Sequence, residues 1–533
     1  MGKRPIRRET IALVALIFSV CLSACGNSIP IDSIFDRGET LRVHASSPVT
    51  LDPAHIGDSV SWQYAIQLYS GLVKLDNDLD IVPDLAESWE LSSDGRTYRF
   101  KLRGEAQFHS GRRVVAGDFV YAYERALRPS TKSTIASQYL GDIVGAQDFN
   151  SGAIPRLTGV RAVDAQTLEI TIDGSKSYFL AKLTHPVGFP LDRANVESGD
   201  RWFERPNGTG PFRMNRWVPN DRMVIQRFNQ HWLGPARVKD VEFNFSPIPG
   251  IVLYEQGEVD VTEIDLSSLD RISDPSNPLS KERITKPLLS TWYVGMNTRM
   301  PPFDDPLVRQ AFAMATDRNR LVEVFFKSTR ALADSILPLG LPGKRQEVRA
   351  VPLDIAGARS TLARSRYARN MPEVVLSVGE GSSSTGEAIA EMYVRNLGID
   401  VGVREYGVDY YQVLDRHEAQ MFVTGWIADY PHPQNFLDIL FHSRSNGNYG
   451  SFQDSEVDQV LEQARIETSE GLRNELYARA EARILSQAAV IPIHHEVIHA
   501  LARPYVRGLV WTSLGILSYH NVEVGTRTVR RAS

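Results

Sequence analysis

A single carboxylate stands between two aromatic side chains near residue 430. The segment reads Gly425-Trp426-Ile427-Ala428-Asp429-Tyr430-Pro431, so Asp429 follows an apolar run and has Trp426 and Tyr430 beside it. This arrangement suits a cation with an apolar side group, because the carboxylate pairs with the charge while the rings pack against the rest. The amino terminus of a peptide is such a cation. The same pattern is also typical of a surface aspartate that follows a buried strand.

The segment His495-Glu496-Val497-Ile498-His499 matches the H-E-x-x-H pattern of zinc peptidases. That chemistry needs a helix, which brings both imidazoles to one face a turn apart. Here the flanking β-branched residues and Pro492 favour a strand. On a strand, residues four apart lie roughly 13 Å apart, too far for one zinc ion. We therefore expect no metal, no cofactor and no enzymatic activity. A metallopeptidase remains the alternative from another functional class.

Two other polar clusters are better explained by the ends of helices. Asp304 and Asp305 have the composition of an acid–base pair, but their place after Pro301-Pro302-Phe303 and before a helix predicts capping. The serines 382–384 lack the Lys-Ser/Thr partner of a phosphate-binding loop, so they predict a loop that opens a helix.

The first 24 residues have the organisation of a processing signal. A basic start is followed by the apolar stretch Ile11 to Leu22, which is too short to span a bilayer comfortably, and then by Leu22-Ser23-Ala24-Cys25. Small residues before a cysteine resemble the lipobox of bacterial lipoproteins, so we predict lipid attachment at Cys25. An ordinary secretory signal is the alternative. The protein would then be tethered to a membrane in the cell envelope, on the periplasmic or extracytoplasmic side.

Length and composition limit the possible functions. A chain of 533 residues predicts two or three domains. Cys21 lies in the signal and Cys25 would carry lipid, so no thiol or disulfide is expected in the mature chain. Removing the signal changes the formal net charge from −5 to −8, which argues against binding to nucleic acid.

The expected secondary structure places Asp429 at the edge of a parallel sheet. Residues 374–378 and 399–403 predict strands, and apolar residues between 388 and 397 recur at helical spacing before Gly398. Strand, helix and strand in about thirty residues predict a βαβ unit. Residues 421–427 predict another strand of that sheet, and ligands of such sheets collect at the carboxyl ends of strands. Elsewhere, alternating segments such as 97–103 and 167–172 predict an antiparallel sheet.

From about Thr40 to Val510 the chain resembles the family 5 extracellular solute-binding proteins, and within them the oligopeptide-binding proteins of ABC importers. The motifs that carry this resemblance occur in the order of the family: Gly71–Val73, Pro83–Trp89, Asp94–Tyr98, Phe100–Arg103, Phe108–Gly111, Ala116–Val120, Asn207–Phe212, Gly257–Asp260, Pro301–Asp305, Val308–Ala311, Ala428–Tyr430 and Ile491–Ile493. Each motif is weak alone, but together, in register, they are specific.

The resemblance implies an α/β protein with a two-lobed periplasmic-binding-protein-like fold, a hinge and an additional accessory domain. After the signal at 1–24, the implied lobe I is discontinuous, with residues 25–60, 185–285 and 493–533. The accessory domain takes residues 61–184, and lobe II takes residues 286–492. The implied function is to enclose short peptides between the lobes and deliver them, as a monomer, to the permease of an ABC importer.

The resemblance also implies the roles of individual residues. Asp429 is expected to pair with the α-ammonium of the peptide, and Trp426 to line a side-chain pocket. The remaining predicted ligand contacts are Tyr430, Tyr293, Ser46, Ser47, His494 and His495. For Tyr293, packing in the core is the alternative.

Three departures from the family pattern affect the predicted cargo. Ile427 replaces a cysteine, and Val423 replaces a basic residue that meets a ligand carboxylate in relatives, so the length of the peptide is not predicted. His494-His495-Glu496 replaces a tyrosine-rich strand, which suggests a more polar or pH-responsive pocket. Another cargo on the same fold, such as a nickel chelate, haem, a sugar or an opine, is the alternative function.

Overall fold

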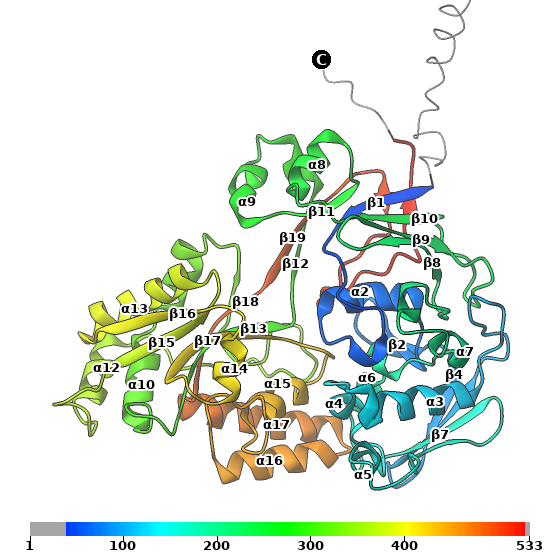
Figure 1. The fold of residues 1–533 in the computed structure, drawn as a ribbon. Helices are drawn as coiled ribbons and strands as arrows, with labels where there is room; N and C mark the ends of the chain where they lie inside the picture. Colours follow the sequence, from blue (N-terminus) through cyan, green and yellow to red (C-terminus); the bar gives the residue numbers. More distant parts are fainter. Residues whose placement is uncertain (1–38, 528–533) are drawn as a thin grey trace, which may run out of the picture.

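The computed structural model describes residues 39–527. Figure 1 shows an upper body and a lower right body that adjoin each other, and a separate body at the left. We call the upper body lobe I, the left body lobe II and the lower right body the accessory domain. Each contains one of the three larger sheets. No helix within residues 39–527 is both long enough and apolar enough to cross a bilayer.

Lobe I is built on a seven-stranded mixed sheet of order β12-β19-β11-β1-β10-β9-β8. Its strands are β1 (Thr40–His44), β8 (Phe212–Val218), β9 (Arg222–Arg227), β10 (Asp240–Asn244), β11 (Val261–Glu263), β12 (Arg283–Pro287) and β19 (Val497–Ala502). Helices α8 (Gly250–Gln256) and α9 (Leu266–Ser273) pack beside it. The central strand β1 runs parallel to both of its neighbours, so the carboxyl ends of β1, β10 and β11 share one edge.

A fully buried aspartate ties the ends of the described chain to this sheet. Asp260, the last residue of the Gly257–Asp260 motif, accepts hydrogen bonds from Arg42 of β1 (2.6 Å) and from Arg527 (2.9 Å). The phenol of Tyr505 donates to the same carboxylate at 2.9 Å. Burial alone would raise the pKa of Asp260, but the two arginines lower it below its ordinary value. The motif therefore supplies a buried anion that two cations neutralise.

Lobe II has a six-stranded sheet of order β14-β18-β13-β17-β15-β16 between two layers of helices. Its strands are β13 (Ser290–Met296), β14 (Ala331–Leu332), β15 (Val374–Gly379), β16 (Val401–Tyr406), β17 (Met421–Ile427) and β18 (Val490–His495). One face packs against α10 (Pro306–Ala315), α12 (Ile355–Leu362) and α13 (Ser383–Leu397). The other packs against α15 (Gln434–Phe441), α16 (Ser455–Ile466) and α17 (Glu470–Ser486). This lobe also contains the helices α11 (Arg318–Arg320) and α14 (Tyr410–Asp415) and the π-helical segment η7 (Leu321–Phe325).

The accessory domain contains a four-stranded antiparallel sheet of order β4-β5-β7-β6. Its strands are β4 (Ala86–Leu91), β5 (Thr97–Leu102), β6 (Val160–Ala162) and β7 (Thr167–Thr171). Its helices include α3 (Ala116–Leu127), α4 (Ala136–Leu140), α5 (Ala146–Asn150) and α6 (Phe179–Lys182). Helix α2 (Ser59–Leu68) and the hairpin of β2 (Val73–Leu75) and β3 (Ile81–Pro83) lie between this domain and lobe I. One continuous core of buried residues extends from the accessory domain into lobe I.

Two short crossovers connect the sheets of lobe I and lobe II. One runs from β12 to β13 through Leu288 and Leu289, and the other from β18 to β19 through Glu496. The Leu288 N–H donates to the Glu496 carbonyl at 2.9 Å, so the crossovers lie side by side. Since each joins two long elements through one or two residues, this point has the form of a hinge. The boundary expected between residues 492 and 493 falls inside β18.

The predicted elements around the βαβ unit are confirmed. β15 pairs in parallel with both β16 and β17, and α13 ends at Gly398, whose φ of 71° lies in the left-handed region. Asp305 caps α10 by accepting from the Leu307 N–H at 2.9 Å. Ser382 precedes α13 as the prediction requires. In β5 the aromatic positions are buried and the basic positions are exposed.

Candidate functional site

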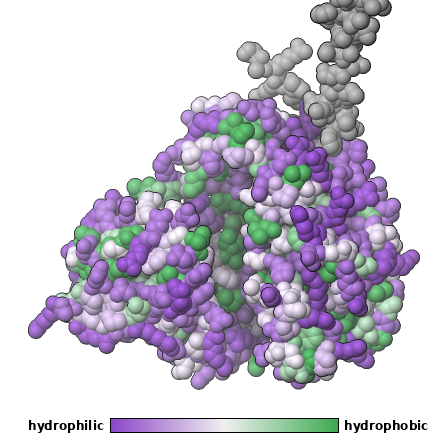
Figure 2. Space-filling view, in the orientation of Figure 1, coloured by the Kyte–Doolittle hydropathy of each residue, from purple (hydrophilic) through white to green (hydrophobic). Residues whose placement is uncertain are grey.

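A deep groove separates lobe II from lobe I and the accessory domain, and hydrophobic residues are visible in its depth (Figure 2). Strands β15, β16 and β17 are parallel, so they all end at one edge of the lobe II sheet. Asp429 lies two residues beyond the end of β17, and its carboxylate contacts Gln138 of the accessory domain. The prediction that Asp429 follows a strand end is confirmed, and the residue lies where two bodies meet.

The half-buried Asp429 is held by neutral hydrogen-bond donors from both sides. Asn435 of α15 donates from Nδ2 to the carboxylate Oδ2 at 3.0 Å, and its Oδ1 accepts the Asp429 backbone N–H at 2.9 Å. From α4, Gln138 Nε2 donates to the same Oδ2 at 3.2 Å. The phenol of Tyr139 also faces this carboxylate.

Asp429 has no salt bridge within residues 39–527, and Lys182 is a cation whose charge lowers its pKa. That side chain donates to Asp142 at 2.7 Å, so its charge is already paired. Burial raises the pKa of Asp429 above its ordinary value of 3.8, and the donors Asn435 and Tyr139 oppose this only in part. An anion solvated by neutral donors retains its attraction for a cationic ligand.

The two aromatic neighbours of Asp429 have different surroundings. Trp426 is half-buried, and its Nε1 donates to Asn435 Oδ1 at 3.1 Å, which fixes the ring next to the carboxylate. Tyr430 is 1% exposed and packs into the core shared by lobe I and the accessory domain. Its hydroxyl donates to Gln434 Oε1 at 2.6 Å. Trp426 therefore keeps surface that a ligand can contact, whereas Tyr430 anchors the loop.

Ser46 and Ser47 follow β1, at the edge where the parallel strands of lobe I end. Ser46 is exposed, and its carbonyl accepts from the Tyr64 hydroxyl at 2.6 Å. Ser47 is half-buried, and its Oγ accepts from the Asn220 N–H at 3.4 Å. Both retain accessible polar groups, and their contact with a ligand stays a prediction.

Tyr293, His494 and His495 are buried within lobe II, with 4%, 6% and 2% of their surfaces exposed. Tyr293 packs in the core beneath α15–α17, which favours the core-packing alternative over ligand contact. The His494 ring stacks on Trp292 with a centroid distance of 5.9 Å. His495 donates from Nδ1 to the Ser290 carbonyl at 2.6 Å. These positions do not support contact between these three side chains and a ligand in this conformation.

The two histidines also do not form the pH-responsive pocket that the sequence suggests. Burial lowers the pKa of His494 to about 3 and that of His495 to about 4, so both are neutral near pH 7. The reason is that β18 is an interior strand of its sheet, between β13 and β14, with side chains covered on both faces.

The extended structure predicted for the H-E-x-x-H segment is confirmed. His495 ends β18 and His499 lies in β19. His499 Nε2 donates to the Thr329 carbonyl at 3.0 Å, whereas His495 bonds to Ser290, so the imidazoles have separate partners. Among residues 39–527, no group of three or more His, Cys, Asp or Glu side chains has the arrangement of a metal site.

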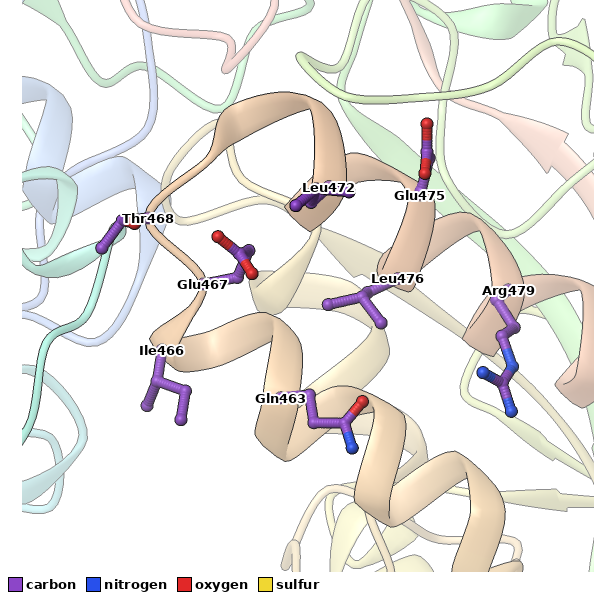
Figure 3. A pocket seen from close by; sticks show the side chains of 8 residues that line it. All are labelled: Gln463, Ile466, Glu467, Thr468, Leu472, Glu475, Leu476 and Arg479. Carbon is purple, nitrogen blue, oxygen red and sulfur yellow. The ribbon is translucent and has the colours of Figure 1, made fainter.

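A second hollow, of about 680 Å³, opens between α16 and α17 (Figure 3). Its lining residues are Gln463, Ile466, Glu467, Thr468, Leu472, Glu475, Leu476 and Arg479. Leu472 and Ile466 are more than half exposed, so the hollow is a surface groove of the helical hairpin. None of the predicted ligand contacts lines it.

Sequence reasoning missed the partners of Asp429. Asn435 lies six residues further along, in the first turn of α15, and an asparagine near a helix start is a local signal that it makes hydrogen bonds. Gln138 is separated from Asp429 by 291 positions, and no pattern in the sequence marks it. Cys25, the predicted lipid-bearing residue, lies outside the described residues.

Three relatives align with nearly the whole chain. The periplasmic murein peptide-binding protein MppA of Escherichia coli is 30% identical over 519 residues, which cover 92% of this chain and 94% of MppA. The periplasmic oligopeptide-binding protein OppA of Escherichia coli is 28% identical and covers 89% of this chain and 90% of OppA. Heme-binding protein A of Haemophilus influenzae is 26% identical, with coverage of 90% and 91%.

The fold agrees with a solved relative as well. The structure of the Escherichia coli murein tripeptide binding protein MppA superposes with a TM-score of 0.77 at 27% identity. The match covers 93% of this chain and all of that one, so the two-lobed periplasmic-binding-protein-like fold is confirmed. The family model for bacterial extracellular solute-binding proteins, family 5, matches residues 80–448. The chain belongs to this family of non-enzymatic solute-binding proteins, which serve ABC importers.

Proposed function

We propose that the protein binds short peptides by their amino terminus and encloses them between lobe I and lobe II. The observation that carries this is the Asp429 carboxylate, which lies where lobe II meets the accessory domain, with neutral donors and no paired cation among residues 39–527. A peptide α-ammonium supplies the missing charge, and Trp426 offers an apolar surface beside it. The relatives named for peptide binding support the same cargo.

The site is connected to the hinge through the backbone. The Ala428 N–H donates to the carbonyl of Leu289 at 2.8 Å, and Leu289 lies in the first crossover between the lobes. A ligand that touches both lobes stabilises the closed arrangement and so shifts the population toward it. We propose that this closed form delivers the peptide to the permease of the importer.

The test compares a free tripeptide with its N-acetylated form by titration calorimetry. Losing a charge-assisted contact of about 1.5–3 kcal/mol weakens binding at least roughly tenfold, so acetylation should have this effect on the wild type. Asp429→Asn should weaken the free peptide and largely remove the difference between the two forms. The matched control is Asp200→Asn, which alters an exposed aspartate that follows α7 (Arg193–Val196). Equal affinity of the wild type for both forms would show that the amino terminus is not recognised.

Haem is the second candidate cargo, because Heme-binding protein A is a full-length relative. Native mass spectrometry of protein purified without denaturation distinguishes the two candidates. A retained mass series of peptides supports the proposal, whereas a retained porphyrin supports the alternative.

The proposed site of action is the cell envelope, with the protein tethered by lipid at Cys25. This rests on the signal-like segment before Cys25 and on the periplasmic relatives. Cys25→Ser should release the protein from membranes or leave its signal uncleaved. Unchanged membrane partitioning of that variant, with no lipid found by mass spectrometry, would contradict the tether.

A further inference from the structure

The loop that carries Asp429 makes several contacts with the accessory domain. Besides the hydrogen bond from Gln138 to Asp429, Ser177 Oγ lies 3.1 Å from Nε2 of His432. The Nδ1 of His432 accepts the Gln434 N–H at 3.1 Å, so the neutral ring carries its proton on Nε2 and donates to Ser177. Tyr430 adds its buried ring to the core on that side. The loop is thus fitted to the accessory domain at three points.

The contacting surface on α4 is itself rigidly held. Tyr139 is 3% exposed, and its ring stacks on His185 with a centroid distance of 3.9 Å and an interplanar angle of 17°. The ring of Trp62 also packs against His185, with a centroid distance of 4.8 Å. Burial lowers the pKa of His185 to about 3, so the stack is uncharged near neutral pH. The phenol of Tyr139 is therefore fixed where it faces Asp429.

We propose that Gln138 and Tyr139 of α4 are positioning residues for Asp429, so that the accessory domain forms one wall of the site for the ligand's amino group. Their donors orient the carboxylate and stabilise its charged form before the ligand arrives, which lowers the cost of binding a cation. This inference rests on the proposed function, because it assigns a role toward the same ammonium group.

The most informative variant is Gln138→Lys, which places a positive charge beside Asp429. Gln138 is exposed on α4, so the longer side chain can be accommodated without disturbing the fold. The new ammonium would pair with Asp429 and compete with the ligand. Binding of a free tripeptide should weaken roughly tenfold or more, whereas binding of the N-acetylated peptide should change little. The matched control is Gln147→Lys, which adds the same charge at an exposed position of α5.

A second variant, Tyr139→Phe, keeps the stacked ring and removes only the hydroxyl. With one donor lost, the Asp429 carboxylate takes up a proton at higher pH. The loss of peptide affinity on the acidic side should therefore begin at a higher pH than in the wild type. Tyr121→Phe, on α3, is the control. A residue that only packs would change thermal stability without moving this profile.

The outcomes separate the two proposals. In one outcome the wild type binds free peptide more tightly than acetylated peptide, and Gln138→Lys and Tyr139→Phe both keep the same affinity ratio and the same dependence of affinity on pH. The role proposed for α4 is then wrong, and the proposed function stands. If the wild type does not discriminate at all, the proposed function fails, whatever the α4 variants do.

Discussion

Asn435 bonds to Asp429 twice, since its amide oxygen accepts the Asp429 backbone N–H and its amide nitrogen donates to the Asp429 carboxylate. The same oxygen accepts from the Trp426 indole. Asn435 is fully buried near the start of α15. A helix therefore sets the orientation of both the anion and the aromatic surface, although Asp429 itself lies in a loop.

Asn435→Leu should weaken the binding of free peptide at least roughly tenfold, because the carboxylate loses a donor and two N–H groups lose their acceptor. Calorimetry with free and N-acetylated peptides measures the effect, which should be larger for the free form. Asn396→Leu is the matched control, since Asn396 is also buried in lobe II and donates to Ala315 at 2.8 Å on the opposite face of the sheet. The control variant should lower the stability of the fold without changing peptide affinity. An equal loss of affinity in both variants would contradict the role of Asn435.

Peptide affinity should depend on pH in a way that acetylation alters. In the ligand-free protein burial raises the pKa of Asp429, and a bound ammonium favours the charged carboxylate. Affinity should therefore fall as the pH falls through this raised pKa. It should also fall above a pH of about 8, where the ligand's amino group loses its proton. Calorimetry across this range checks both limbs, and parallel profiles for free and acetylated peptides would refute the pairing.

Glu481 should make the stability of the protein depend on pH. The side chain is fully buried, its Oε1 accepts the Leu337 N–H at 2.8 Å, and burial raises its pKa from 4.5 to about 7. Between these values the unfolded chain has lost the proton that the folded protein keeps. Stability should therefore fall as the pH rises through this window, by up to about 3 kcal/mol.

Glu481→Gln stays neutral, so urea unfolding measured between the two pKa values should show a weaker dependence on pH than in the wild type. Glu475→Gln, at an exposed position of the same helix, should leave the dependence unchanged. If the stability of the Glu481 variant depends on pH as strongly as that of the wild type, then other groups cause this dependence.

Asp260→Asn should destabilise the protein by about 3–5 kcal/mol, because it leaves Arg42 and Arg527 without their buried anion. Glu523→Gln is the control, since it removes an exposed ion pair with Arg237 and should cost about 1 kcal/mol or less. Chemical denaturation measures both. Comparable losses of unfolding free energy in the two variants would show that the buried ion pairs of Asp260 stabilise the protein no more than an exposed pair does.

The sequence was sufficient to predict the elements that present Asp429. Strands β15, β16 and β17 and helix α13 form from local patterns, and the parallel order follows from the βαβ rule, whereas α14 was not predicted. The position of Asp429 after β17 then required only the length of one apolar run. Local periodicity is informative here because the apolar residues of these segments are buried within one sheet and the helices that cover it.

The surroundings of the site could not be predicted in the same way. His494 and His495 look polar enough for a pocket, but β13 and β14 flank their strand and helices cover its faces, which only the strand order shows. Gln138 reaches Asp429 because lobe II and the accessory domain meet there. Contacts of this kind depend on how the bodies dock, which leaves no periodic signal in the sequence.

The strand order of lobe I also dictates when this lobe can be completed as the chain is made. β12 is an edge strand whose one neighbour is β19, and about 210 residues, most of lobe II, separate them in sequence. Until residues 497–502 emerge, β12 has no strand to pair with and β11 lacks one of its two neighbours. Lobe II can therefore form while lobe I is still open. The last long strand to be synthesised closes the sheet and the second hinge crossover in one step.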